Sequence, residues 1–227
     1  MKGKIITIEG TDCSGKETQS KLLYERLLSE GIDVYRDSFP MYDTPTGKII
    51  GASYLGKENM GKPLFEEGAS NVDYKVASLY FAADRRYNYL KKLKSIIDSG
   101  KTLILDRYVE SNMAHQGGKI INNQERYNAY EFLHTLEYVL LGLPKPDMTI
   151  FLYMPYEYSV KLRNKRDEKP DQHEMDINHL KHAEQAYLEL ENIYKFERIN
   201  CVEDEIIKLP EEISNEVYNK VKKLIKK

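Results

Sequence analysis

The sequence predicts an α/β fold in which a five-stranded parallel sheet is flanked by helices on both faces. Five short runs rich in Ile, Val, Leu and aromatic residues recur along the chain, and longer amphipathic stretches separate them. No internal repeat or low-complexity tract interrupts this alternation. We therefore expect the 227 residues to form a single domain, residues 1–227, whose ligands bind at the carboxyl ends of the strands.

The expected strands are short and lack strict polar alternation, which is typical of strands buried on both faces. They cover residues 4–9, 33–39, 102–106, 148–154 and 197–201. The expected helices cover residues 15–29, 71–99, 124–141, 156–166 and 175–194, and a last helix runs from Pro210 to the C-terminus. Proline suits the first turn of a helix, and two glutamates follow Pro210.

Composition limits the classes of partner. Lys and Arg number 34 against 36 Asp and Glu, so no overall positive field attracts nucleic acid or an anionic membrane. No apolar segment is long enough to cross a bilayer, and no signal peptide is recognisable, so a cytoplasmic protein is expected. Cys13 and Cys201 lie far apart in sequence and are expected to be free thiols.

A phosphate-binding motif follows the first expected strand. The segment "GTDCSGKETQ" contains G-x-x-x-x-G-K between a strand and a helix, the context that gives the motif its meaning. Backbone N–H groups and the helix N-terminus then surround a phosphate, and the lysine reaches the outer phosphates of ATP. The expected ATP-binding residues are Gly10, Thr11, Asp12, Cys13, Ser14, Gly15, Lys16, Glu17 and Thr18.

Two carboxylates are candidates for holding the Mg²⁺ that accompanies ATP. Asp106 ends the third expected strand, where nucleoside triphosphate sites place a metal-organising aspartate. Glu17 follows the loop lysine, at the position where a Ser or Thr hydroxyl usually ligates the ion. Thr18 projects at a different angle of the helix. Whether Glu17 touches the metal therefore stays open.

The motifs in their order resemble the thymidylate kinases, a family of P-loop nucleoside monophosphate kinases. The resemblance extends over nearly the whole chain, through "FP" at 39–40, "YFAADRR" at 80–86, "DRYVESNMAHQGG" at 106–118 and Tyr-x-x-Leu at 187–190. It implies a three-layer P-loop NTPase fold with a short lid at about residues 163–175. It also implies a homodimer that transfers the γ-phosphoryl group of Mg·ATP to dTMP, giving dTDP and ADP.

The resemblance implies roles for individual residues. Lys16 would hold the donor phosphates, Asp12 would lie near the metal and the acceptor sugar, and Arg107 would bind the acceptor phosphate. Phe81 would stack on thymine, and Arg85 and Asn112 would hydrogen-bond its edge. His115 falls where the family often places an aromatic residue against the deoxyribose, excluding a 2′-hydroxyl. The full set expected at dTMP is Asp12, Phe39, Tyr42, Phe81, Arg85, Arg107, Ser111, Asn112, His115 and Gln116.

The chain departs from the family pattern at two places. Met41 and Tyr42 stand where an arginine frequently binds the acceptor phosphate, so that contact is missing or comes from elsewhere, Lys48 being one candidate. The loop has Cys13 where some members carry an arginine, so the catalytic charge on the transferring phosphoryl group is expected from the lid. The candidates are Arg163 and Arg166, while Gln172 replaces a further lid arginine.

Parts of the sequence also fit three other functions. "NKRD" at 164–167 matches the guanine motif of GTP-binding switches, but it ends a charged helical stretch rather than a buried strand. A kinase for dUMP, another monophosphate or a nucleoside is a closer alternative, although Arg107 favours an acceptor that carries a phosphate. A nucleotide-binding subunit without turnover is the non-enzymatic alternative.

Overall fold

The computed structural model describes residues 2–57, 60–164 and 176–225. Its central sheet has five parallel strands in the order β2-β3-β1-β4-β5, which confirms the predicted fold class. The strands are β1 (Ile5–Glu9), β2 (Val34–Ser38), β3 (Thr102–Asp106), β4 (Met148–Tyr153) and β5 (Glu197–Asn200).

Strand register brings the ends of the central strands together. In the sheet, Ile8 of β1 lies opposite Asp106 of β3 on one side and Ile150 of β4 on the other. The segments that follow β1 and β3 therefore leave the same edge of the sheet next to each other. Strand β1 connects to β2 on one side of the sheet, and its neighbour β3 connects to β4 on the other side. The carboxyl edge between β1 and β3 is therefore the switch point at which open α/β sheets bind ligands.

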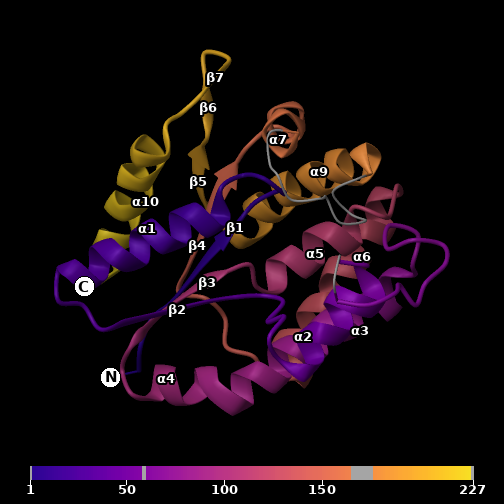
Figure 1. Ribbon diagram of the computed structural model, residues 1–227, viewed down its shortest axis with the longest axis horizontal. Coiled ribbons are helices and arrows are strands. Elements are labelled where there is room, and N and C mark those ends of the chain that lie inside the picture. The colour runs from indigo at the N-terminus through magenta and orange to yellow at the C-terminus, as the bar shows by residue number, and fades with distance from the viewer. Residues whose placement is uncertain (1, 58–59, 165–175, 226–227) are drawn as a thin grey trace.

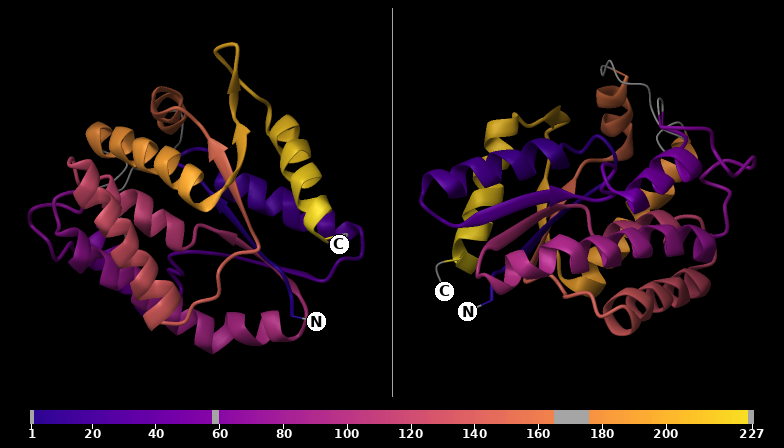
Figure 2. Two further views of the ribbon diagram at one scale, coloured as in Figure 1. Left: turned by 180° about the vertical axis from the view of Figure 1, so that it is seen from behind. Right: turned by 60° about the horizontal axis from the view of Figure 1, so that its bottom comes forward.

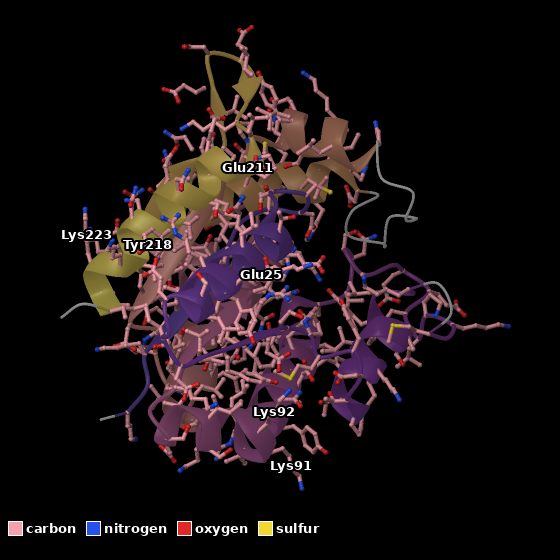
Figure 3. All side chains as sticks on the ribbon, turned by 60° about the vertical axis from the view of Figure 1, so that its left-hand side comes forward. Glu25, Lys91, Lys92, Glu211, Tyr218 and Lys223 are labelled. Carbon is pink, nitrogen blue, oxygen red and sulfur yellow. The ribbon has the colours of Figure 1, made fainter. Side chains whose placement is uncertain are left out.

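Helices α1 (Lys16–Ser29) and α10 (Pro210–Ile225) cover one face of the sheet. Figure 3 views this layer, with Glu25 labelled on α1 and Tyr218 on the neighbouring α10. The guanidinium group of Arg26 lies 3.4 Å from the centre of the Tyr218 ring, and its Nη1 donates to Asn215 Oδ1 at 2.9 Å. These contacts join the first and last helices of the chain.

The opposite face carries the larger helical layer (Figures 1 and 2). Its helices are α3 (Tyr74–Asn88), α4 (Lys94–Asp98), α5 (Val109–Gly117), α6 (Asn123–His134) and α9 (Ile177–Tyr194). The π-helical segments η2 (Tyr89–Leu93) and η3 (Thr135–Leu140) continue α3 into α4 and extend α6, so the long helices predicted over 71–99 and 124–141 are present. Tyr130, Phe151 and Tyr187 fill the core between this layer and the sheet.

Five elements in three places were not predicted from the sequence. Helix α5 lies within the "DRYVESNMAHQGG" motif, and all nine of its residues are buried although five are polar or charged, so it has no apolar stripe to detect. Helix α2 (Pro45–Ile49) and segment η1 (Ile50–Tyr54) form one short helical stretch after β2. Strands β6 (Val202–Glu203) and β7 (Ile206–Ile207) form a hairpin whose strands are too short for a recognisable pattern.

The remaining helix, α7 (Tyr156–Arg163), follows β4 and ends at the first residue of the predicted lid. Most of that lid, residues 165–175, lies outside the described ranges. None of the helices within those ranges combines the length and the apolar character needed to span a bilayer.

Candidate active site

A cavity of about 680 Å³ opens at the carboxyl edge of the sheet, at the predicted switch point. The loop after β1, the ends of β2 and β3, and helices α3 and α5 all contribute to it. Its lining comprises Asp12, Cys13, Gly15, Lys16, Glu17, Thr18, Arg36, Ser38, Phe39, Pro40, Tyr42, Leu55, Lys57, Phe81, Arg85, Asp106, Arg107, Ser111, Asn112, His115, Gln116 and Leu162.

The phosphate loop connects β1 to α1 along one wall of this cavity. Gly10 is required there, because a Cβ atom would lie 2.6 Å from Ser14 Oγ and 2.7 Å from the Leu152 carbonyl oxygen. Gly15 has φ +85° and is the N-cap of α1, so the helix N-terminus faces the loop. Gly10 itself, Thr11 and Ser14 shape the loop without lining the cavity.

Lys16 supplies a positive charge to the loop. Its Nζ donates to the Thr11 carbonyl oxygen at 2.5 Å and contacts Ser14 Oγ at 3.4 Å, so the ammonium group lies within the turn. Burial lowers the pKa of Lys16 to about 8, and the nearby Arg107 contributes to this shift. An anion bound by the loop would favour the charged form.

Arg107 lies between the phosphate loop and α5. It follows β3 with φ +67°, forms an ion pair with Asp12, and places Nη1 3.4 Å from Ser111 Oγ and 3.3 Å from His115 Nε2. The guanidinium group is thus held in the cavity by the loop aspartate and by two residues of α5. A bidentate donor in that position suits a phosphate dianion.

Glu9 lies beneath Arg107 and is a residue that the sequence analysis missed. Its carboxylate accepts hydrogen bonds from the Tyr108 backbone N–H at 2.7 Å, the Ser111 hydroxyl at 2.5 Å and the Tyr187 hydroxyl at 3.0 Å. Burial raises the pKa of Glu9, while these bonds and Arg107 oppose the shift. The only available signal was an acidic residue ending an otherwise apolar strand.

Arg85 and Asn112 meet at a second buried carboxylate, Glu137. Arg85 forms an ion pair with Glu137 through two atoms: Nε contacts Oε2, and Nη2 lies 2.7 Å from Oε1. Asn112 Nδ2 donates to Oε1 of Glu137 at 2.9 Å. Arg85 Nη1 donates to the Tyr108 carbonyl oxygen at 3.3 Å. Both residues line the cavity, but much of their donor capacity is taken up by protein groups.

Three buried amide atoms beside this cluster lack partners. Within the described part of the chain, Gln116 Nε2, Gln116 Oε1 and Asn112 Oδ1 make no hydrogen bond, although both residues line the cavity. Buried polar groups are rarely left unsatisfied without a functional reason. Phe81 lies nearby, with its ring edge-on to Tyr54 at a centroid distance of 5.4 Å. An aromatic plane and free amide groups suit a nucleobase recognised at its edge.

His115 stacks against a second histidine that the sequence analysis did not single out. The His115 and His179 rings are 5.4 Å apart and inclined by 23°, with Nδ1 of His115 3.1 Å from Nε2 of His179. Burial lowers the pKa of His115 well below its usual value, with Arg107 and His179 acting in the same direction and Asp12 opposing. A neutral ring can accept the Arg107 N–H at Nε2. His179 stands in the first turn of α9, directly after the lid.

All ten residues expected at dTMP line the cavity, and so does Asp106. Lys48 is exposed and lies outside the lining, whereas Arg36 and Lys57 line the cavity without having been expected there. Arg163 ends α7 next to the lining residue Leu162 but is not itself part of the lining. Arg166 and Gln172 lie outside the described residues.

Two carboxylates of the cavity, Asp106 and Glu17, are the candidates to hold one Mg²⁺ ion shared with phosphates. Asp106 is buried at the end of β3, and Glu17 is exposed on the first turn of α1, yet both line the same cavity. Among the described residues no cluster of three metal-ligating side chains exists. Mg²⁺ is typically bound by one or two carboxylates together with substrate phosphates and water, so this donor set is sufficient only when a nucleotide is present.

Three features together define a P-loop nucleotide-binding protein. They are a glycine-containing loop after the central strand, an Asp-Arg pair at the end of the next strand, and a cavity at the switch point. A sequence profile described as Thymidylate kinase matches residues 8–213. The chain therefore belongs to the thymidylate kinase family, whose members are nucleoside monophosphate kinases.

Individual relatives agree with this assignment. A thymidylate kinase of Halothermothrix orenii is 31% identical over 231 residues, covering 98% of each chain. A probable thymidylate kinase of Thermococcus kodakarensis is 32% identical over 218 residues, covering 93% of this chain and 98% of the relative. The fold is shared with the structure of thymidylate kinase from Candida albicans, which superposes with a TM-score of 0.72 at 24% identity, covering 98% of this chain and 92% of that one.

Proposed function

We propose that this chain transfers the γ-phosphoryl group of Mg·ATP to dTMP, giving dTDP and ADP. The observation that carries the proposal is that Lys16 and Arg107 line one cavity with Gln116, whose two amide atoms make no hydrogen bond to the described residues, and Asn112, whose Oδ1 makes none. Two separate cations suit a donor and an acceptor that both carry phosphates, and free amides beside Phe81 suit a base.

The residues of the chain act by binding and by placing charge. Lys16 and the loop N–H groups hold the donor phosphates, and Arg107, positioned by Asp12, holds the acceptor phosphate in line with them. Asp106, with Glu17 as a second candidate, would hold Mg²⁺, which neutralises phosphate charge when bound. The acceptor phosphate is itself the nucleophile, so no side chain needs to form a covalent intermediate.

The base would lie over Phe81, within reach of Gln116 and Asn112. Thymine offers both a donor at N3 and acceptors at its carbonyl oxygens, which complement an amide with neither group in use. Arg85 would contribute through Glu137, which fixes it and orients Asn112 at the same time. Tyr42 and Phe39 would close the other side of the acceptor site.

A homodimer is proposed on the basis of an apolar stripe along α3 and η2. Val76, Leu79, Tyr87 and Leu90 are 41%, 54%, 36% and 54% exposed at helical spacing, and a second copy of the chain would cover them. Sedimentation equilibrium should give about twice the 26.5 kDa chain mass. The Leu79→Glu variant should give the mass of a single chain. A single-chain mass for the unsubstituted protein would remove this proposal.

The cytoplasmic location inferred from the sequence remains a prediction.

The proposal is tested by chromatographic analysis of nucleotides after incubation with ATP, Mg²⁺ and dTMP. We expect dTDP and ADP to appear in equal amounts. Lys16→Met should abolish both while leaving the circular dichroism spectrum unchanged. ADP without dTDP would mean that the site hydrolyses ATP, and no ADP with a folded protein would favour a nucleotide-binding subunit without turnover.

A further inference from the structure

Arg36 is a cation of the cavity to which the preceding roles give no function. Its Nε donates to Ser20 Oγ at 2.8 Å, and Ser20 is fully buried in α1, so the guanidinium group lies against that helix. It lines the cavity together with Lys16 and Asp106. Within the described residues, the two terminal amino groups of Arg36 make no hydrogen bond or ion pair.

Glu17 is a carboxylate in the same situation. It is exposed on the first turn of α1 and lines the same cavity, and its side chain has no hydrogen bond or ion pair in the part of the chain described. In the usual motif this position carries a neutral Ser or Thr. The glutamate therefore adds a negative charge where the loop and the helix N-terminus are arranged to bind phosphates.

Ser20 connects the two groups. It lies three residues after Glu17 and therefore on the same face of α1. Its hydroxyl accepts from Arg36 Nε and donates to the Glu17 backbone oxygen at 2.9 Å. Ser20 thus holds the guanidinium group against the face of α1 from which Glu17 also projects.

Asp106 lies within electrostatic range of both groups. Burial raises the pKa of Asp106, and Lys16, Arg107 and Arg36 oppose the rise while Glu17 adds to it. Arg36 and Glu17 thus act with opposite signs on one buried carboxyl group. Their charges would also act together on a phosphate bound beside Asp106.

We propose that Arg36 is the counter-ion of Glu17 at the phosphate loop, which leaves Asp106 as the carboxylate that would hold Mg²⁺. When a nucleotide binds, the guanidinium group neutralises the glutamate, which then does not repel the polyphosphate. The two opposite charges cancel, so the loop keeps the net charge of a motif with Ser or Thr at that position. Arg36 is a positioning residue that acts through Glu17, and the proposal rests on the proposed function only in requiring ATP to bind at the loop.

A double-mutant cycle tests this coupling. ATP affinity is measured by titration calorimetry with EDTA present and no acceptor, so that neither metal ligation nor turnover contributes. We expect Arg36→Ala to weaken binding about fivefold when Glu17 is present and by less than about twofold in a Glu17→Ser background. Equal losses in both backgrounds would mean that Arg36 contacts the phosphates directly, and no loss in either would mean that it has no role; both results overturn the proposal.

Matched variants separate charge from folding. Arg36→Lys should retain most of the affinity because it keeps the charge, and a lysine that restores none of the affinity would contradict neutralisation. Lys21→Ala removes an exposed cation from α1 outside the cavity and should change nothing. The Arg36→Ala loss should shrink at high salt. If the unsubstituted protein fails to bind ATP at all, the proposed function fails rather than this coupling.

Discussion

Arg85 of α3 and Glu137 of η3 form a buried two-contact ion pair at the floor of the cavity, and Glu137 also accepts a hydrogen bond from Asn112. The side chains of Arg85 and Glu137 are 3% and 0% exposed. A buried pair of this kind depends on both partners, because removing one leaves an uncompensated charge. The carboxylate therefore supports the folded state and arranges two residues proposed to face the base.

Glu137→Gln should weaken dTMP binding more than it changes turnover. The amide cannot balance the charge of Arg85, so Arg85 and Asn112 should lose their fixed positions and the free energy of unfolding should fall by about 3 kcal/mol. Steady-state kinetics would show a raised KM for dTMP with an almost unchanged KM for ATP. Glu131→Gln, on the exposed side of α6, is the matched control and should behave like the parent protein. A KM for dTMP equal to that of the parent would refute this role.

Gln116→Met should separate ligand binding from stability. Both amide atoms of Gln116 are buried and make no hydrogen bond to any residue that the structure describes, so an apolar side chain of similar volume removes an unsatisfied group. We expect the melting temperature to stay equal or rise, while the KM for dTMP rises about tenfold. A lower melting temperature with an unchanged KM would show that the amide serves the fold rather than the base.

ATP affinity should fall as pH rises above about 8. Lys16 has a pKa lowered to about 8 in the free protein, so it is charged below that pH and increasingly neutral above it. ATP binds the charged form of Lys16, so above this pH the lysine must take up a proton when ATP binds. The dissociation constant should therefore rise by up to about tenfold per pH unit. Lys16→Met should bind weakly with little slope in this range. A dissociation constant of the parent that is flat from pH 7 to about pH 9 would contradict the assignment.

Arg166→Ala should lower turnover far more than it raises the KM values. A lid arginine is proposed to contact the transferring phosphoryl group mainly in the transition state, when negative charge develops on that group. Loss of the arginine should therefore destabilise the transition state more than the ground state. Arg163→Ala deserves the same kinetic comparison, because the sequence does not choose between the two. Unchanged turnover in both variants would rule out this source of positive charge.

Much of the fold and part of the site could be predicted because the signals are local. Five apolar runs marked the strands, and the spacing of Gly10, Gly15 and Lys16 located the phosphate loop directly. Helix α5 was missed because its polar residues are all buried and four of the five line the cavity, where function rather than an apolar stripe determines the sequence.

The supporting residues could not be predicted because they depend on long-range contacts. Glu137 is separated from Arg85 by 52 positions and Glu9 from Tyr187 by 178, and no spacing rule connects such pairs. A glutamate within the apolar stretch "FLHTLEYVLLGL" was the available hint for Glu137. Arg36 was overlooked because it lies within a strand, and only the sheet register and Ser20 bring it to the cavity.

The measurement that tests the central claim most directly is ADP formation from Mg·ATP with dTMP, dUMP, dGMP, UMP and thymidine compared as acceptors. We predict strong turnover with dTMP and little with UMP or thymidine, since the site provides Arg107 for an acceptor phosphate and free amides for the base. A preference for thymidine, or for a monophosphate other than dTMP, would contradict the proposed acceptor. No ADP formation with any of the five acceptors would contradict the kinase activity itself.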